Sequence, residues 1–159
     1  MHRTFYDAQI ETLNKGRRHG NDKNDNGVKD VSKQRKKIVQ EAYGWLGTPY
    51  GYGKADKGVA CDCSGMVMSV YEKVTGIKLP RNSAKQSEFC RNLKKRDVLA
   101  GDLCFFATGK DPEKISHVGI MVDDSNFIHA STSKGVVISD INQPYYTRTF
   151  KCFGRVPDK

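Results

Sequence analysis

Two cysteines lie one residue apart in the segment GVACDCSGMVMSVYEKVTG, residues 58–76, where a glycine-rich loop passes into a helical pattern. The first turn of a helix carries unpaired N–H groups and a partial positive charge, and both stabilise a thiolate. A cysteine in this place has a lowered pKa and reacts as a nucleophile. We predict that Cys63 begins the helix and is the nucleophile, whereas Cys61 lies in the loop outside this field.

A nucleophilic thiol requires a base, and the chain has four histidines. His2 and His19 lie in a polar N-terminal segment, whereas His117 and His129 lie at the ends of two predicted strands joined by a turn. In an antiparallel hairpin an odd number of loop residues puts both rings on one face, with Gly119 opposite His129, and an even number puts them on opposite faces. We predict an odd loop, or a bulge with the same effect.

Cys63, His117 and His129 together have the residue types of a catalytic triad. In such a triad Cys63 attacks a carbonyl carbon, His117 takes the thiol proton, and His129 accepts a hydrogen bond from the other ring nitrogen of His117, which fixes the tautomer. The structural alternative is that Cys63 is a small, inert, buried residue.

The other cysteines show no pattern of a metal site. The chain has five cysteines, so at least one thiol stands outside any internal disulfide. No paired CxxC spacing is present, and we expect neither a metal ion nor another cofactor. Cys104 and Cys152 lie in apolar predicted strands, where packing is the expected role. Spacing leaves open whether Cys61, Cys90, Cys104 or Cys152 form disulfides.

Length and charge limit the class of protein. A chain of 159 residues suits one domain with one hydrophobic core. The formal net charge of +9 favours an anionic partner, but no nucleic-acid-binding motif accompanies it, so we expect no nucleic acid. No run of about 18 apolar residues is present, and we expect no transmembrane segment. The first residues also lack the apolar stretch of a secretory signal.

The predicted elements divide the chain into a tail and one domain. Residues 1–31 are polar and glycine-rich, which is typical of a tail or linker, and residues 32–159 are predicted to form the domain. We predict a first helix with Ser32 as its N-cap and Gly47 as its stop signal. The helix from Cys63 should end at Gly76.

A third, short helix is predicted over residues 83–89, where Ser83 and Gln86 have capping-box spacing. Beyond Leu99, short segments rich in Val, Ile and Phe predict strands. These segments are DLCFFA, HVGIMVD, NFIHAS, GVVISD and TFKCFGRV. Helices followed by strands indicate an α+β domain in which the N-terminal helices pack on a central antiparallel sheet.

Six segments, in order and spacing, resemble the NlpC/P60 family of cell-wall cysteine peptidases: GTPYGYG, DCSGMV, LPRNSAKQ, AGDLCFF, SHVGIMV and FIHAS. The resemblance covers roughly residues 35–156. It implies a papain-like α+β fold and hydrolysis of peptidoglycan stem peptides, usually at the bond between D-γ-glutamate and a diamino acid. It also implies Cys63 as nucleophile, His117 as base and His129 as the third member of the triad.

The resemblance and the chemistry together suggest groups for the oxyanion and the groove. The backbone N–H of Cys63 and the hydroxyl of Tyr50 are candidate donors to an oxyanion, although Tyr50 could also be a packing residue beside Pro49. Tyr52 stands where many members of the family have tryptophan, and is expected to shape the substrate groove.

Four further residues match positions that line or approach the groove in the family. Asp62 and Ser64 flank the nucleophile, and Asp62 either pairs with a substrate amine or caps the helix. Arg81 and Ser83 belong to the LPRNS segment. Arg81 either binds the free α-carboxylate of γ-linked glutamate or forms a surface ion pair.

The leading hypothesis is therefore a cysteine endopeptidase acting on bacterial peptidoglycan or muropeptides as a monomer. The alternatives are an N-acetylmuramoyl-L-alanine amidase or an acyltransferase on the same fold, or a non-catalytic module that binds the cell wall. The chain order of Cys63, His117 and His129 argues against a permuted acyltransferase. We expect a location in the cell envelope, periplasmic or secreted, on the assumption that the given sequence omits a leader.

Overall fold

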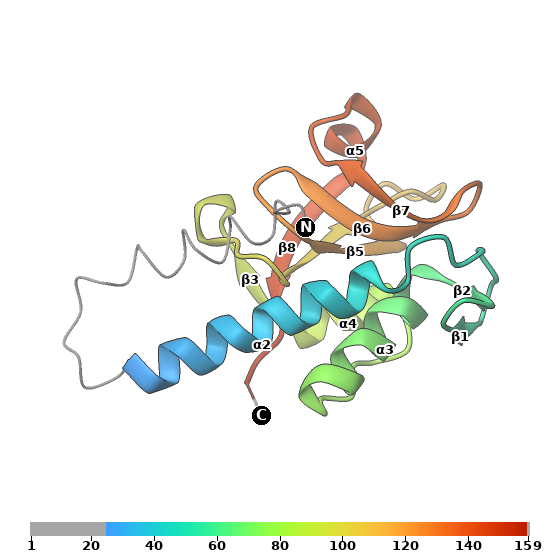
Figure 1. Ribbon diagram of the computed structural model, residues 1–159. Helices are drawn as coiled ribbons and strands as arrows, with labels where there is room; N and C mark the ends of the chain where they lie inside the picture. Colours follow the sequence, from blue (N-terminus) through green and yellow to red (C-terminus); the bar gives the residue numbers. More distant parts are fainter. Residues whose placement is uncertain (1–24, 159) are drawn as a thin grey trace.

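The computed structural model describes residues 25–158 (Figure 1), so residues 1–24 of the tail predicted over 1–31 lie outside the described part, and residues 25–31 belong to a helix instead. The elements in chain order are α2 (Asp25–Tyr43), β1 (Ala55–Asp56), β2 (Ala60–Cys61), α3 (Cys63–Thr75), α4 (Ser83–Phe89), β3 (Arg91–Leu93), the 3₁₀ turn η2 (Lys95–Asp97), β4 (Leu103–Phe106), β5 (His117–Met121), β6 (Asn126–Ser131), β7 (Gly135–Asp140), α5 (Pro144–Thr149) and β8 (Phe150–Arg155).

The main sheet is antiparallel, with strand order β3-β8-β4-β5-β6-β7. The helices α2 and α3 lie across one face of this sheet (Figure 1). The predicted α+β architecture, with N-terminal helices on an antiparallel sheet, is confirmed. No helix within residues 25–158 combines the length and the apolar character needed to cross a membrane.

Each face of the sheet has its own apolar core. Alternation along the strands sends Phe105 and Ile128 into the core under α2 and α3. The neighbouring residues Phe106 and Phe127 belong to a smaller core on the opposite face. Since His129 follows Ile128 in β6, its ring lies on the face that α2 and α3 do not cover.

A buried ion-pair cluster ties α2 to the sheet. Asp102 is completely buried and accepts hydrogen bonds from Arg35 of α2 at 3.1 Å and Arg155 of β8 at 2.8 Å. It also accepts from the backbone N–H of Leu99 at 2.7 Å. A buried carboxylate requires such partners. The aspartate of the AGDLCFF segment, Asp102, therefore has a structural role.

The helix α2 begins at Asp25, seven residues before the predicted start. Ser32 is therefore not an N-cap: it lies inside the helix, where it is buried. The physical reason is that adding a residue to an existing helix costs less free energy than nucleating a new helix. A polar segment that contains no proline can therefore continue the helix. At the other end α2 stops at Tyr43, and hydrogen-bonded turns lead to Gly47, which has a φ of 85°.

The other two predicted helices have the predicted bounds. Gly76 closes α3 in the left-handed conformation, and its N–H bonds to the carbonyl of Glu72. The cap of α4, however, is Asn82 rather than Ser83, because the Asn82 side chain accepts the N–H of Lys85 at 2.9 Å. The predicted capping box is wrong.

The elements that the sequence pattern did not predict are all short. The strands β1 and β2 are two residues each, and β3 has three. The helix α5 has six residues and begins with Pro144. Segments of this length hold less than two helical turns or two strand repeats, so no period can be recognised in them.

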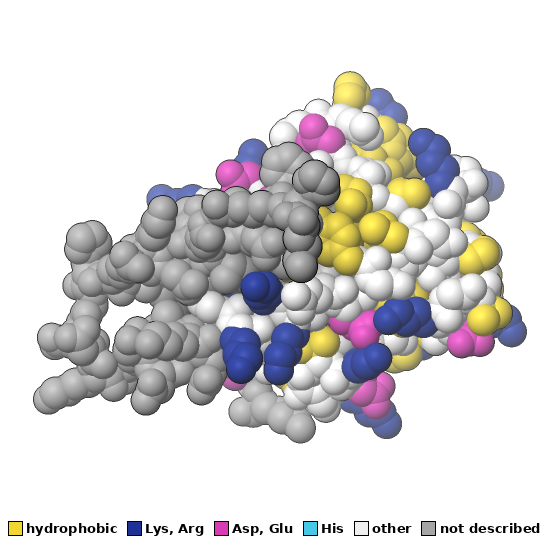
Figure 2. Space-filling model, in the orientation of Figure 1, with side chains coloured by type: hydrophobic (Ala, Val, Ile, Leu, Met, Phe, Trp, Pro, Cys, Tyr) yellow, Lys and Arg dark blue, Asp and Glu magenta, His cyan; other side chains and the backbone are white. Residues whose placement is uncertain are grey.

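Basic side chains are spread over the surface shown in Figure 2. Lys and Arg are separated by neutral surface, and Asp and Glu lie among them.

Candidate active site

Asp62 fixes the start of α3 and with it the position of Cys63. Its carboxylate accepts the N–H groups of Gly65 and Gly53, both at 2.8 Å, and two hydrogen bonds from Arg81 at 3.0 Å. Burial would raise the pKa of Asp62, but Arg81 and these N–H groups outweigh it and lower the pKa. The cap alternative is thus what the structure shows, and the carboxylate is already fully bonded.

The sulfur of Cys63 lies against the beginning of β5. The strands β5 and β6 pair only at Ile120 with Ile128 and at Met121 with Phe127, so the beginning of β5 is not joined to β6. The sulfur lies 4.0 Å from the carbonyl oxygen of Ser116 and receives a hydrogen bond from the N–H of Val118. The nucleophile candidate therefore touches the backbone on both sides of His117.

His117 and His129 lie on one face and are hydrogen-bonded to each other. The last Cα pair of β5 and β6, Met121 with Phe127, encloses five residues, an odd number, and the same register carried further back sets Gly119 opposite His129. Nε2 of His117 is 2.8 Å from Nδ1 of His129, and the rings are nearly perpendicular at 86°. A Cβ on Gly119 would lie 2.6 Å from the Phe127 ring, so only glycine fits. The predicted odd loop is confirmed.

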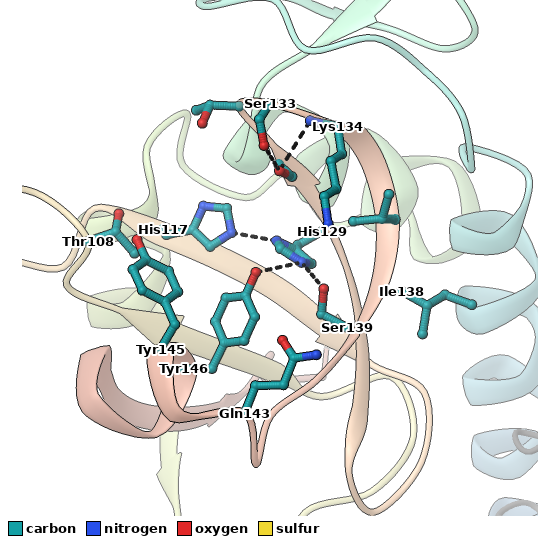
Figure 3. Close-up of a pocket in the computed structure, with 13 residues that line it drawn as sticks. Thr108, His117, His129, Ser133, Lys134, Ile138, Ser139, Gln143, Tyr145 and Tyr146 are labelled. Carbon is teal, nitrogen blue, oxygen red and sulfur yellow. Dashed lines mark hydrogen bonds between the residues drawn. The ribbon is translucent and has the colours of Figure 1, made fainter.

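The hydrogen-bond chain continues beyond His129 to two residues of the C-terminal half. Nε2 of His129 is 2.8 Å from Oγ of Ser139 in β7 and 3.5 Å from the hydroxyl of Tyr146 in α5 (Figure 3). If Nδ1 of His117 is the free acceptor, each ring donates its Nε2–H to the next group in the chain, ending at Ser139. This arrangement leaves a basic nitrogen on His117.

Sequence reasoning missed Ser139 and Tyr146. For Ser139 a signal exists, because the pairing of Phe127 with Ser139 in the β6–β7 ladder puts the hydroxyl on the face of His129. For Tyr146 there was none, since the short helix α5 has no recognisable period.

Burial keeps all three triad candidates neutral. It lowers the pKa of His117 to about 4, and it lowers the pKa of His129, with the help of the neighbouring His117, to about 3. Burial raises the pKa of Cys63, although hydrogen bonds from Val118 and Ser64 act in the opposite direction. The prediction that the helix start lowers this pKa is wrong, because desolvation of the sulfur outweighs the N–H groups.

The other four cysteines are buried or half-buried. All five thiols are free. Cys61 is fully buried, and burial raises its pKa to about 11, as an inert thiol requires. Burial also raises the pKa of Cys90 to about 12 and that of Cys104 further. Cys104 is buried in β4 as predicted, and Cys152 is half-buried.

The two tyrosines that were predicted to belong to the site differ in exposure. Tyr50 is half-buried against the helix-side core. Its pKa is raised, first by burial and then by the negative charge that Cys63 carries when ionised. Tyr52 is 88% exposed and is not among the residues that line the cavity beside the two histidines.

Ser64, Arg81 and Ser83 lie on the helix side of Cys63. Arg81 donates to Oγ of Ser64 at 2.9 Å as well as to Asp62, so the predicted surface ion pair is present. Its side chain is also partly open to solvent. Ser83 is buried in α4. Gln86 of the same helix donates to the carbonyl of Ser64 at 3.1 Å and so braces the first turn of α3.

A cavity of about 470 Å³ opens on the histidine side of the site (Figure 3). Neither Cys63 nor Tyr50, Asp62 or Arg81 lines it. The lining comes from both histidines, the β6–β7 turn, β7 and α5: Thr108, His117, His129, Ser131, Thr132, Ser133, Lys134, Val137, Ile138, Ser139, Gln143, Tyr145 and Tyr146. Within residues 25–158 no three His, Cys, Asp or Glu side chains gather as metal ligands.

Comparisons with known proteins agree with this geometry. The family model described as "NlpC/P60 family" matches residues 47–155. The chain is 34% identical over 135 residues to "Murein DD-endopeptidase MepS/Murein LD-carboxypeptidase" of Escherichia coli K12, covering 85% of this chain and 69% of that protein. It is 32% identical over 137 residues to "Bifunctional muramidase/DL-endopeptidase CwlT" of Bacillus subtilis, covering 86% of this chain and 41% of that protein.

A solved structure shows the same fold. The NLP/P60 family protein similar to lipoprotein from Staphylococcus aureus Mu50 aligns with a TM-score of 0.71 at 30% identity, covering 80% of this chain and 42% of that one. With the family match spanning the helix start, both histidines and the whole sheet, the chain belongs to the NlpC/P60 family.

Proposed function

We propose that this protein is a cysteine endopeptidase that hydrolyses peptidoglycan stem peptides at the cell envelope. Cys63 is the nucleophile, His117 the general base, and His129 the third member of the triad. The observation that carries the proposal is the 2.8 Å hydrogen bond between His117 and His129, next to a sulfur that contacts the backbone on both sides of His117. The relatives' names support murein as the substrate.

The neutral state of the site determines how the thiol reacts. A thiol with a raised pKa beside an imidazole with a lowered pKa forms no ion pair at rest. Proton transfer from Sγ to Nδ1 of His117 therefore accompanies attack on the carbonyl carbon. The imidazolium that forms is stabilised by the hydrogen bond to His129, in a buried site where such bonds are strong.

The developing oxyanion needs donors on the helix side. The N–H of Cys63 at the start of α3 is one, and the hydroxyl of Tyr50 is the second. When the tetrahedral intermediate collapses, the C–N bond breaks and His117 returns the proton to the leaving nitrogen. Water then hydrolyses the thioester, with His117 again taking a proton, and the free thiol is restored.

The scissile bond is proposed to join D-γ-glutamate to the diamino acid. The partly exposed guanidinium of Arg81, held by Asp62 beside Ser64, can receive the free α-carboxylate of a γ-linked glutamate. The word DL-endopeptidase in the name of the Bacillus subtilis relative supports this bond. The name of the Escherichia coli relative favours a second candidate, a bond between two D-residues of a cross-link.

Digestion of purified peptidoglycan tests the proposal. Muropeptides are incubated with the wild type or with Cys63→Ala and the products are identified by mass spectrometry. Products cut within the stem peptide by the wild type alone support the endopeptidase, and the new termini identify the bond. Release of intact stems from the glycan indicates the amidase, transfer to an added amine indicates the acyltransferase, and binding without cleavage indicates the wall-binding module.

A further inference from the structure

Tyr146 of α5 lies beside the outer end of the histidine pair. Its hydroxyl is 3.5 Å from Nε2 of His129, the same atom that lies 2.8 Å from Oγ of Ser139 (Figure 3). The Tyr146 ring meets the His129 ring edge-on, with the centroids 5.5 Å apart and the planes at 84°. Nε2 of His129 therefore has two hydroxyl neighbours at different distances.

Aromatic contacts hold the Tyr146 ring in this place. It meets Phe127 edge-on at 5.0 Å and Phe106 edge-on at 5.5 Å, which is a favourable arrangement of aromatic rings. Phe127 also packs on His129 at 4.4 Å, and His129 is only 1% exposed. The position of the phenol is thus fixed by packing and does not depend on its own hydrogen bond.

The two distances separate the roles of the two hydroxyls. At 3.5 Å the Tyr146 hydroxyl is too far from a neutral His129 for a strong hydrogen bond, so Ser139 at 2.8 Å sets the resting tautomer. When His117 takes the thiol proton, its charge polarises His129 through their shared hydrogen bond. Hydrogen bonds of charged groups are shorter and about twice as strong as neutral ones. The second hydroxyl is therefore close enough to respond when the pair gains charge.

We infer that Tyr146 is a positioning residue whose hydroxyl accepts a second hydrogen bond from His129 when the histidine pair is protonated. The inference rests on the proposed function, in which His117 takes up the thiol proton. Nε2–H of His129 would then be shared between Oγ of Ser139 and the phenol oxygen of Tyr146. Both hydroxyls also line the cavity, so each can donate its own hydrogen there.

Three other titratable groups surround the pair. Cys63 lies against the beginning of β5, and Lys134 and Tyr145 belong to the lining of the cavity. The positive charge of Lys134 disfavours a proton on the pair, and the ring of Tyr145 contacts that of Tyr146 at 5.2 Å. A neutral acceptor on His129 therefore acts against this unfavourable charge.

Two variants of Tyr146 separate the hydroxyl from the ring. Tyr146→Phe removes the hydroxyl and keeps the ring, whereas Tyr146→Ala also opens the pair to solvent. Thr147→Val is the matched control, because it removes another hydroxyl of α5, which is exposed and donates to the carbonyl of Pro144 at 3.0 Å. Nitrogen NMR at pH 4.5 measures the protonated fraction of the histidines, circular dichroism checks that each protein is folded at this pH, and kcat and KM are measured on a stem peptide.

The inference predicts opposite changes in the two variants. Burial lowers the pKa of His117 to about 4, so about a quarter of the wild type should be protonated at pH 4.5. In Tyr146→Phe this fraction should fall to about a tenth and kcat should fall about threefold at unchanged KM, because the protonated pair loses an acceptor. In Tyr146→Ala the fraction should rise, because water reaches the pair. Thr147→Val should match the wild type.

An unchanged or higher protonated fraction in Tyr146→Phe would overturn the inference, since a residue that only covers the rings would give that result. The NMR measurement needs no substrate and so tests Tyr146 independently of cleavage. A wild type that cleaves no stem peptide would overturn the proposed function, whereas the protonated fractions would still decide whether Tyr146 acts on the pair.

Discussion

Different interactions stabilise the two sides of Cys63, the helix side and the sheet side. On the helix side Asp62, Ser64 and Arg81 form a charged, fully hydrogen-bonded cluster that holds the first turn of α3. On the sheet side His117 and His129 are joined in a neutral chain that burial keeps from taking up protons. The ion pair of Asp62 and Arg81 thus holds the helix start that carries the nucleophile. Burial of the imidazole keeps His117 unprotonated, so that its free nitrogen can accept the thiol proton.

The largest effect is expected from removing the base. His117→Ala should lower kcat about 10³–10⁴-fold on a stem peptide, because proton transfer to a positioned base is lost. His117→Gln is the matched variant, since the amide keeps hydrogen-bonding capacity without basicity, and it should lose as much. Activity of either variant within tenfold of the wild type would contradict the role given to the sheet side.

The next largest effect is expected from removing the carboxylate that holds the helix side. Asp62→Ala removes the cap of α3 and leaves Arg81 without its partner, which should lower the free energy of unfolding by about 2–3 kcal/mol. Asp62→Asn restores a cap without the charge and should lose about half as much. Urea unfolding curves measure both, and a loss below about 0.5 kcal/mol in Asp62→Ala would show that this cluster does not hold the helix.

Acid should weaken the sheet side. The pKa of His129 is about 3 in the folded protein against about 6.5 when unfolded. Below pH 6.5 the unfolded chain therefore binds a proton that the folded chain does not, and stability falls as pH falls toward 3. The loss for His129 between pH 7 and pH 5 is about 2 kcal/mol, seen as a drop in the urea midpoint.

The variant His129→Gln should lose less stability between these pH values, because the group that gains a proton on unfolding is gone. An equal drop in this variant and the wild type would assign the acid sensitivity to other groups.

The smallest effect concerns the end of the hydrogen-bond chain. Ser139→Ala should lower kcat about fivefold, since His129 loses the acceptor that orients it, about 1 kcal/mol. Ser139→Thr should restore activity, and nitrogen NMR of the histidines should show a mixed tautomer in Ser139→Ala alone. A single tautomer in that variant would mean that Ser139 only packs against the ring.

Much of this arrangement could be predicted from the sequence, because it depends on local patterns. The apolar stripe, Asp62 and Gly76 define α3, and the alternation of the two strands sets the histidines on one face. The bounds of α2 were not predictable from a cap signal, since a helix can extend through polar residues once it is packed.

The protonation states and the outer members of the site depend on tertiary structure. The direction of the Cys63 pKa depends on how deeply the sulfur is buried between α3 and β5, which no local pattern records. The contact of Tyr146 with His129 requires α5 to fold back over the sheet. For the same reason the cavity beside Lys134 emerges only when β7 and α5 are placed.

The pH dependence of Cys63 alkylation tests the central claim most directly. Iodoacetamide labelling of residue 63 is followed by mass spectrometry from pH 5 to pH 11, with Cys63→Ala as the background for the four other thiols. A neutral thiol beside a neutral imidazole predicts slow labelling at pH 7 and a rise above pH 9. A rapid plateau that begins below pH 7 would reveal a resting thiolate and imidazolium pair, and would contradict the account.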